Sequence, residues 1–146
     1  MNGTIESGKK LIEIIKAAKL DPKVEVVVAP PAIHLLPVKE ALKGYPIEVS
    51  GQNAHQKPSG AFTGEVSVFQ LQDAGISWVI IGHSERRTLF GESDDVVAEK
   101  TKSALDHNLS VILCVGETLE QREKNESINV VIRQLDAARA KVSDWR

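Results

Sequence analysis

The chain has 146 residues, of which 42% are hydrophobic and 26% are charged, and its formal net charge at pH 7 is −2. This composition is typical of a soluble globular protein with a core, and the weak, mixed charge argues against nucleic acid and anionic membranes as partners. No apolar run approaches the roughly 18 residues of a membrane span, and the first residues lack the pattern of a secretory signal. Cys114 is the single cysteine, which excludes an internal disulfide and favours a reducing compartment.

The first third of the chain predicts a helix, a strand, a second helix and a second strand. The opening helix is predicted by an apolar stripe with helical spacing, formed by Leu11, Ile12, Ile14, Ile15 and Ala18. The β-branched run at residues 24–28 predicts a strand. A proline pair then precedes a short helix at residues 31–42, and residues 47–50 predict the next strand.

Two further strands are predicted at residues 78–81 and 111–115, both rich in Val and Ile. Between them, Ser93 is suited to begin a helix and Asn108 to end it in the left-handed conformation. The apolar stripe of that helix is weak and consists of Val97, Ala104 and Leu105. A cleaner stripe predicts the last helix, which ends near Val142, and consists of Ile128, Val131, Ile132 and Leu135.

Together, the four predicted strands indicate a parallel sheet. They are almost continuously apolar, and their starts at 24, 47, 78 and 111 suit successive βα units with four covering helices. An open doubly wound sheet and part of a (β/α)₈ barrel both fit this pattern. The chain opens like a βα loop and its last helix ends where a strand is expected to begin, which favours a partial barrel of about four to five βα units. Residues 1–146 are then one incomplete domain, because a complete barrel has about 250 residues.

His83 is the first candidate for chemistry. In parallel βα folds, functional groups gather at the C-terminal ends of the strands, and His83 follows the third predicted strand where a helical turn begins. Ser84 and Glu85 then lie at the N-terminus of that helix. Because a helix N-terminus disfavours a protonated imidazole, His83 is expected to stay neutral and to donate a hydrogen bond to a developing oxyanion.

Three strand-end segments resemble the triosephosphate isomerase family: residues 82–87 (Gly-His-Ser-Glu-Arg-Arg), 52–65 and 111–118. The resemblance runs over the whole chain, in order and without large gaps. It implies an α/β fold that is a partial (β/α)₈ TIM barrel. It also implies interconversion of dihydroxyacetone phosphate and glyceraldehyde 3-phosphate through an enediolate, in glycolysis and gluconeogenesis. A phosphorylated triose substrate, a cytoplasmic homodimer, no metal and no organic cofactor are further implications.

The resemblance assigns roles to three consecutive residues. His83 matches the electrophile, and the family is itself a standard example of a histidine kept neutral by a helix N-terminus. Glu85 matches the carboxylate that pairs with the active-site lysine. Ser84 matches the serine that the catalytic glutamate contacts before the lid closes.

Other family residues have no counterpart in this chain. The substrate-binding Asn and Lys precede the position of Met1, while the catalytic glutamate, the lid and the glycine-rich phosphate loops follow Arg146. The 146-residue chain alone is therefore expected to be inactive.

The resemblance also implies a dimer interface. One part is the tip of a loop that reaches into the neighbouring subunit, and the other is the end of the family's Asn-x-Lys-Met-Asn-Gly segment. The residues expected there are Met1, Asn2, Gly3, Thr63, Gly64 and Glu65.

The remaining candidates predict no further site. Residues 59–64 are glycine-rich but lack the Gly-Lys-Ser/Thr of a phosphate-binding P-loop. His34, His55 and His107 share no zinc-ligand spacing. Cys114 lies within an apolar strand and is expected in the core.

Three functional hypotheses stay open. The first is a triosephosphate isomerase to which this chain contributes the electrophile. The second is an inactive half-barrel that associates with itself or with a complementing piece, because its outer strands at residues 24–28 and 111–115 lack a neighbour. The third is another sugar-phosphate enzyme on a similar barrel, against which the motif at residues 82–87 argues.

Overall fold

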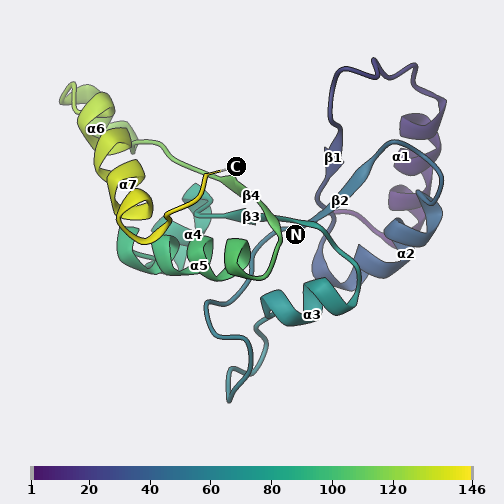
Figure 1. Ribbon diagram of the computed structural model, residues 1–146. Coiled ribbons are helices and arrows are strands. Elements are labelled where there is room, and N and C mark those ends of the chain that lie inside the picture. The colour runs from purple at the N-terminus through teal and green to yellow at the C-terminus, as the bar shows by residue number, and fades with distance from the viewer. Residues whose placement is uncertain (1, 146) are drawn as a thin grey trace.

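A computed structural model describes residues 2–145, which form a parallel four-stranded sheet with helices packed around it (Figure 1). The strands are β1 (Val27–Val28), β2 (Glu48–Gly51), β3 (Trp78–Ile81) and β4 (Ser110–Leu113). They lie side by side in the order β1-β2-β3-β4, and each pairs in parallel with the next. Spatial order therefore follows chain order, as in a sector of a (β/α)₈ barrel, and the predicted fold class is confirmed.

β1 is shorter than the strand predicted at residues 24–28. Pairing begins only at Val27, which lies opposite Glu48, although the carbonyl of Val26 still accepts a hydrogen bond from the Glu48 amide. Val24 is exposed. β1 lies at one edge of the sheet and β4 at the other, as predicted for the two outer strands.

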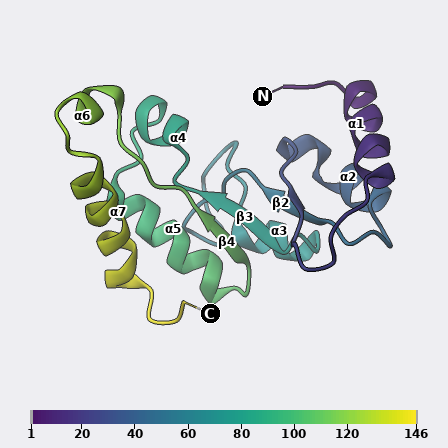
Figure 2. The ribbon, with the colours of Figure 1, turned by 90° about the horizontal axis from the view of Figure 1, so that it is seen from above.

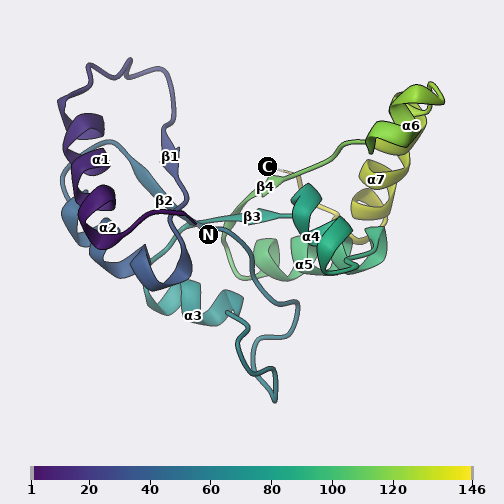
Figure 3. The ribbon, with the colours of Figure 1, turned by 180° about the vertical axis from the view of Figure 1, so that it is seen from behind.

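The helices near the N-terminus cover the β1–β2 end of the sheet. α1 (Ile5–Ala17) begins at Thr4, whose side chain forms a capping box with Ser7. The predicted helix at residues 31–42 is a 3₁₀ turn, η1 (Ala32–His34), followed by α2 (Leu35–Ala41). α1 and α2 pack together at one end of the molecule (Figure 3). Only Ile12 of the predicted α1 stripe is fully buried.

The number of helices differs from the prediction of four covering helices. Within residues 2–145 there are seven α-helices, because an unpredicted helix lies between β2 and β3, and the segments after β3 and β4 each form a short helix before the long one. The remaining helices are α3 (Val68–Asp73), α4 (Ser84–Leu89), α5 (Asp94–Asp106), α6 (Leu119–Glu123) and α7 (Ser127–Lys141). α5 begins at the Ser93 cap, and Asn108 has φ 58, so both predicted boundaries are confirmed.

α7 packs along α5 beyond the β4 edge of the sheet, as Figure 2 shows from above. The predicted apolar stripe is not its buried face. Val130, Gln134 and Ala138 are buried, whereas the stripe residues Ile128, Ile132 and Leu135 are exposed. Helix α7 therefore has an apolar stripe that no other part of residues 2–145 covers.

One hydrophobic core joins the sheet to the helices. Its largest fully buried apolar side chains are Val68, Leu71, Val79, Ile81 and Val97. These side chains come from α3, β3 and α5, so the core lies under the two central strands. The C-terminal ends of those strands are thereby held in fixed relative positions.

Candidate active site

His83 lies at the C-terminal end of β3, where the chain turns into α4. The preceding residue, Gly82, has φ +78, a conformation that residues with a side chain rarely adopt. A Cβ at this position would lie 2.8 Å from Val97 Cγ1 and 3.1 Å from the Cys114 carbonyl oxygen. Glycine is thus required both by the turn and by close packing, and the turn brings the His83 side chain to the exposed end of the strand.

The hydrogen bonding of His83 indicates which nitrogen carries its proton. The backbone N–H of Glu85 donates to His83 Nδ1 over 3.3 Å, so Nδ1 needs a free lone pair. In the neutral ring the proton then lies on Nε2, which is available as a donor. The Glu85 carboxylate Oε2 lies 3.7 Å from Nδ1 and forms an ion pair only with a protonated ring. The amide hydrogen bond fits the predicted neutral state better than the protonated one.

Ser84 and Glu85 begin the first turn of α4, directly after His83. Both are exposed, and the Ser84 carbonyl accepts a hydrogen bond from the Thr88 hydroxyl. The Glu85 side chain is 75% exposed, which leaves its carboxylate accessible to a cation. The three predicted residues therefore lie together at the C-terminal edge of the sheet.

A cluster of buried ion pairs lies next to the C-terminal edge of the sheet. The Glu92 carboxylate accepts hydrogen bonds from Arg86 Nε and, at 2.6 Å, from Lys100 Nζ. Lys100 is only 3% exposed and also donates to Asn53 Oδ1, at the end of β2. Burial acts to raise the pKa of the Glu92 carboxyl, but the hydrogen bonds and charges of Lys100 and Arg86 outweigh it and hold that pKa below its ordinary value.

Sequence reasoning missed this cluster. A signal was present, because Lys100 lies on the same helix face as Val97 and Ala104, where a lone charge is unexpected. The partners of Lys100 lie outside its own helix: Glu92 precedes Lys100 by 8 residues and Asn53 precedes it by 47. The cluster joins the ends of β2 and β3 through α5.

The sequence profile described as triosephosphate isomerase matches residues 1–146. The chain belongs to the triosephosphate isomerase family. It is 53% identical over 145 residues to a triosephosphate isomerase from Yarrowia lipolytica and covers 99% of its own length but 59% of that protein. For the family members of Emericella nidulans and Neurospora crassa, identity is 52% and 49%, with 57% and 59% of those proteins covered. The chain thus spans 57% to 59% of the length of these curated relatives.

The loop predicted to contact a neighbouring subunit lies in the connection between β2 and α3, which projects away from the rest of the molecule (Figures 1 and 3). It contains Thr63, Gly64 and Glu65, all exposed. Inside the loop the rings of His55 and Phe62 lie 4.0 Å apart. Glu65 approaches Arg86 on α4, with 4.0 Å between carboxylate and guanidinium.

The other residues predicted for the dimer interface lie at the start of the chain. Asn2 and Gly3 line an apolar groove of about 820 Å³ between α1, α2 and the end of β1. Met1 lies outside the described residues. The predicted interface role of both segments is not tested by this geometry.

Glu117, at the end of β4, is already engaged by local partners. Its carboxylate accepts hydrogen bonds from Arg122 Nε at 2.8 Å and from the Ser127 hydroxyl at 3.1 Å. A hydrogen bond from its own backbone N–H, followed by those from Arg122 and Ser127, lowers the pKa of the Glu117 carboxyl. A carboxylate held in this way is a weak candidate for a general base.

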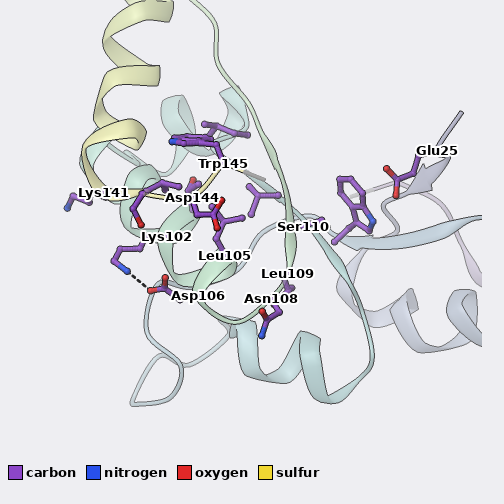
Figure 4. A pocket seen from close by; sticks show the side chains of 16 residues that line it. Glu25, Lys102, Leu105, Asp106, Asn108, Leu109, Ser110, Lys141, Asp144 and Trp145 are labelled. Carbon is purple, nitrogen blue, oxygen red and sulfur yellow. Dashed lines mark hydrogen bonds and ion pairs between the residues drawn. The ribbon is translucent and has the colours of Figure 1, made fainter. Parts of the chain in front are cut away.

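A cavity of about 770 Å³ opens at the opposite, N-terminal edge of the sheet (Figure 4). It lies between the start of β4, the end of α5 and Trp145, and Lys102 pairs with Asp106 on its rim. Parallel βα folds place chemistry at the C-terminal ends of the strands, so this cavity is not the candidate site.

No group of His, Cys, Asp and Glu side chains within residues 2–145 is arranged to hold a metal ion. Over the same residues, no helix combines the length and apolarity needed to cross a membrane. Burial raises the pKa of the Cys114 thiol, and the nearby Arg87 only partly opposes this shift. Cys114 therefore stays a thiol at neutral pH and is a poor nucleophile.

Proposed function

We propose that this chain supplies the neutral histidine electrophile of a triosephosphate isomerase, which interconverts dihydroxyacetone phosphate and glyceraldehyde 3-phosphate. The observation that carries the proposal is the hydrogen bond from the Glu85 amide to His83 Nδ1, which leaves the Nε2 proton for donation. Membership of the family over the whole chain supports the reaction class.

In this reaction a base removes a proton from the carbon next to the substrate carbonyl. The carbonyl oxygen gains negative charge as the enediolate forms, the proton of the adjacent hydroxyl moves to that oxygen, and the base returns its proton to the former carbonyl carbon. His83 Nε2–H donates to that oxygen, and the hydrogen bond strengthens as charge develops. In the proposed reaction the base moves the proton, and the neutral donor together with the family's active-site lysine stabilises the charge on the oxygens, so no metal and no organic cofactor is proposed.

The base and the active-site lysine of the family have no counterpart among residues 1–146. Glu92 is buried in its ion pairs and Glu117 is held by Arg122, so neither is free to take the proton. Glu85 is the exposed carboxylate proposed to pair with the lysine. Ser84 is proposed to contact the catalytic glutamate.

We also propose a homodimer in the cytoplasm, acting in glycolysis and gluconeogenesis. The projecting connection with Thr63 at its tip is the segment that would enter the neighbouring subunit, and residues 1–3, Gly64 and Glu65 would contribute to the same interface. Phe62 supports this role, because a partly exposed aromatic ring in a projecting loop is suited to a protein contact. Residues 1–146 are proposed to be one domain, because a single core joins α1 to β4, and an incomplete one, because they span 59% of the length of the Yarrowia lipolytica relative.

The test is a chimera in which residues 1–146 replace the matching part of the Yarrowia lipolytica relative. This relative supplies the missing segments and is 53% identical in the exchanged region. The folded chimera is expected to isomerise triose phosphate, and the 146-residue chain alone to show less than about a thousandth of that rate, because base and lid are absent. A chimera that folds like its parent but does not turn over triose phosphate would contradict the proposal.

The second candidate function, an inactive half-barrel that associates with itself or with a complementing piece, rests on two kinds of surface that are open to a partner. Among residues 2–145, no strand pairs with the outer side of β1 or of β4, and the α7 stripe is exposed. Intact mass together with size-exclusion chromatography separates the two. A 15.9 kDa chain that self-associates without turnover supports the half-barrel.

A further inference from the structure

Arg87 makes contacts on both sides of His83. Its side-chain Nε donates to the carbonyl of Gly82, the residue before His83, over 2.8 Å. Its backbone N–H donates to the carbonyl of His83 itself over 3.2 Å. The peptide groups that precede and follow His83 are therefore both held by one residue.

The same guanidinium also reaches the neighbouring strand. Arg87 Nη2 donates to the carbonyl of Cys114 over 3.3 Å, just after β4. Nη1 donates to Asp94 over 2.7 Å, and the other oxygen of Asp94 accepts a hydrogen bond from Arg133 on α7. The Arg87 side chain is largely buried and is anchored at its far end, so its donors have little freedom to move.

The geometry points to Arg87 as a positioning residue for His83. By fixing the Gly82 carbonyl, Arg87 limits rotation of the peptide that sets φ of His83. That angle places the ring where Nδ1 meets the Glu85 amide. Arg87 thereby stabilises the tautomer with the proton on Nε2. The contribution of Arg87 to catalysis rests on the proposed function. Its effect on the tautomer of His83 does not depend on that function.

Lysine cannot replace Arg87 in this role. Three of the guanidinium's donors point in fixed directions to Gly82, Cys114 and Asp94, whereas an ammonium group is a compact charge on a flexible stem. Arg87→Lys keeps the charge beside Asp94 and loses the planar set of donors. The variant therefore separates positioning from electrostatics.

The test reads the tautomer of His83 directly, by ¹H–¹⁵N NMR of the imidazole in the 146-residue chain. The parent is expected to show an unprotonated Nδ1 and a protonated Nε2. In Arg87→Lys the two nitrogen signals are expected to move toward each other, as both neutral tautomers become populated. The matched control is Arg86→Lys on the same helix, which should cause a smaller change because Arg86 contacts Glu92 and Glu65 instead.

Unchanged His83 signals in a folded Arg87→Lys chain overturn the inference, as does a parent with its proton on Nδ1. If Arg87→Lys does not fold, Asp94→Asn carries the test, because it weakens the pairing of Asp94 with Arg87 and Arg133 and leaves the Arg87 donors to Gly82 and Cys114 in place. A smaller shift in the same direction is then expected, and no shift overturns the inference.

Kinetics in the chimera give an independent measurement. Arg87→Lys should lower kcat about ten- to a hundredfold with little change in KM, because misplacing a catalytic group costs rate at the chemical step. A change confined to KM contradicts positioning. If the parent chimera is inactive, the proposed function fails, while the NMR measurement still decides the role of Arg87.

Discussion

Gln134 holds both backbone polar groups of Gly116. The Gly116 N–H donates to Gln134 Oε1 over 2.8 Å, and Gln134 Nε2 donates to the Gly116 carbonyl over 3.1 Å. Gln134 is buried on α7, whereas Gly116 follows β4 at the active-site edge. This pair fixes the end of the outer strand to the last helix.

Gln134→Leu removes both hydrogen bonds and should lower the free energy of unfolding by about 1 to 2 kcal/mol, since Gly116 is exposed and water replaces part of the loss. Urea denaturation measures the change. Asn129→Leu, on the exposed side of the same helix, is the control and should stay within about 0.5 kcal/mol of the parent. Equal effects of the two substitutions would show that the Gly116 contact contributes nothing.

Lys100→Met tests the buried ion-pair cluster. The substitution leaves the Glu92 carboxylate buried with one cation fewer, which typically costs about 3 kcal/mol or more. Lys102→Met removes an exposed partner of Asp106 and should change stability by less than about 1 kcal/mol. Chemical denaturation of both variants at neutral pH measures the difference. Similar losses would contradict a special role for Lys100.

The same cluster predicts a dependence on pH. Because the folded-state pKa of Glu92 lies below its ordinary value of 4.5, its stabilising contribution is fully present above that value. The contribution is lost as the pH falls through the lowered pKa. Glu92→Gln does not titrate, so the stability difference between parent and variant should be largest near neutral pH and should shrink in acid. Urea titrations from pH 7 downward measure it, and a constant difference would exclude the linkage.

Gly82→Ala should destabilise the chain by about 2 to 4 kcal/mol, because the positive φ is strained for alanine and its Cβ meets Val97. Gly8→Ala is the opposite case. Gly8 lies inside α1, and nothing lies within 4 Å of an added Cβ, so this change should stabilise by about 0.5 to 1 kcal/mol. Thermal unfolding of the pair compares them, and a neutral Gly82→Ala would contradict the tight turn.

His83→Gln in the active chimera should lower kcat by about a hundred- to a thousandfold, because the donor acts mainly on the charge of the transition state. KM should change little. Steady-state assays in both reaction directions measure this. His107→Gln, at the end of α5, should leave kcat nearly unchanged. A loss seen only in KM would mean that His83 contributes to substrate binding alone.

Local sequence patterns predicted most of the fold. Residues 78–81 form a strand with the predicted bounds, and Ser93 and Asn108 delimit α5 as expected, because these features depend on nearby residues. The exposure of the apolar stripe on α7 was not predictable. Such a stripe indicates that a helix face can be buried, but it does not identify the surface that would cover it. The Lys100 cluster was missed because its partner Asn53 is distant in sequence. The roles of His83, Ser84 and Glu85 stay predictions.

The order of the strands has a consequence for how the molecule opens. Within residues 2–145 each strand pairs only with the strands next to it in chain order, so β1 can separate from β2 without breaking the β2–β3 and β3–β4 pairing. β1 joins the sheet through two residue pairs, whereas all four residues of β3 pair with β4. In amide hydrogen exchange, β1 should therefore lose protection first and β3 last. His83 follows the strand that opens last, so its surroundings persist while the N-terminal units fray.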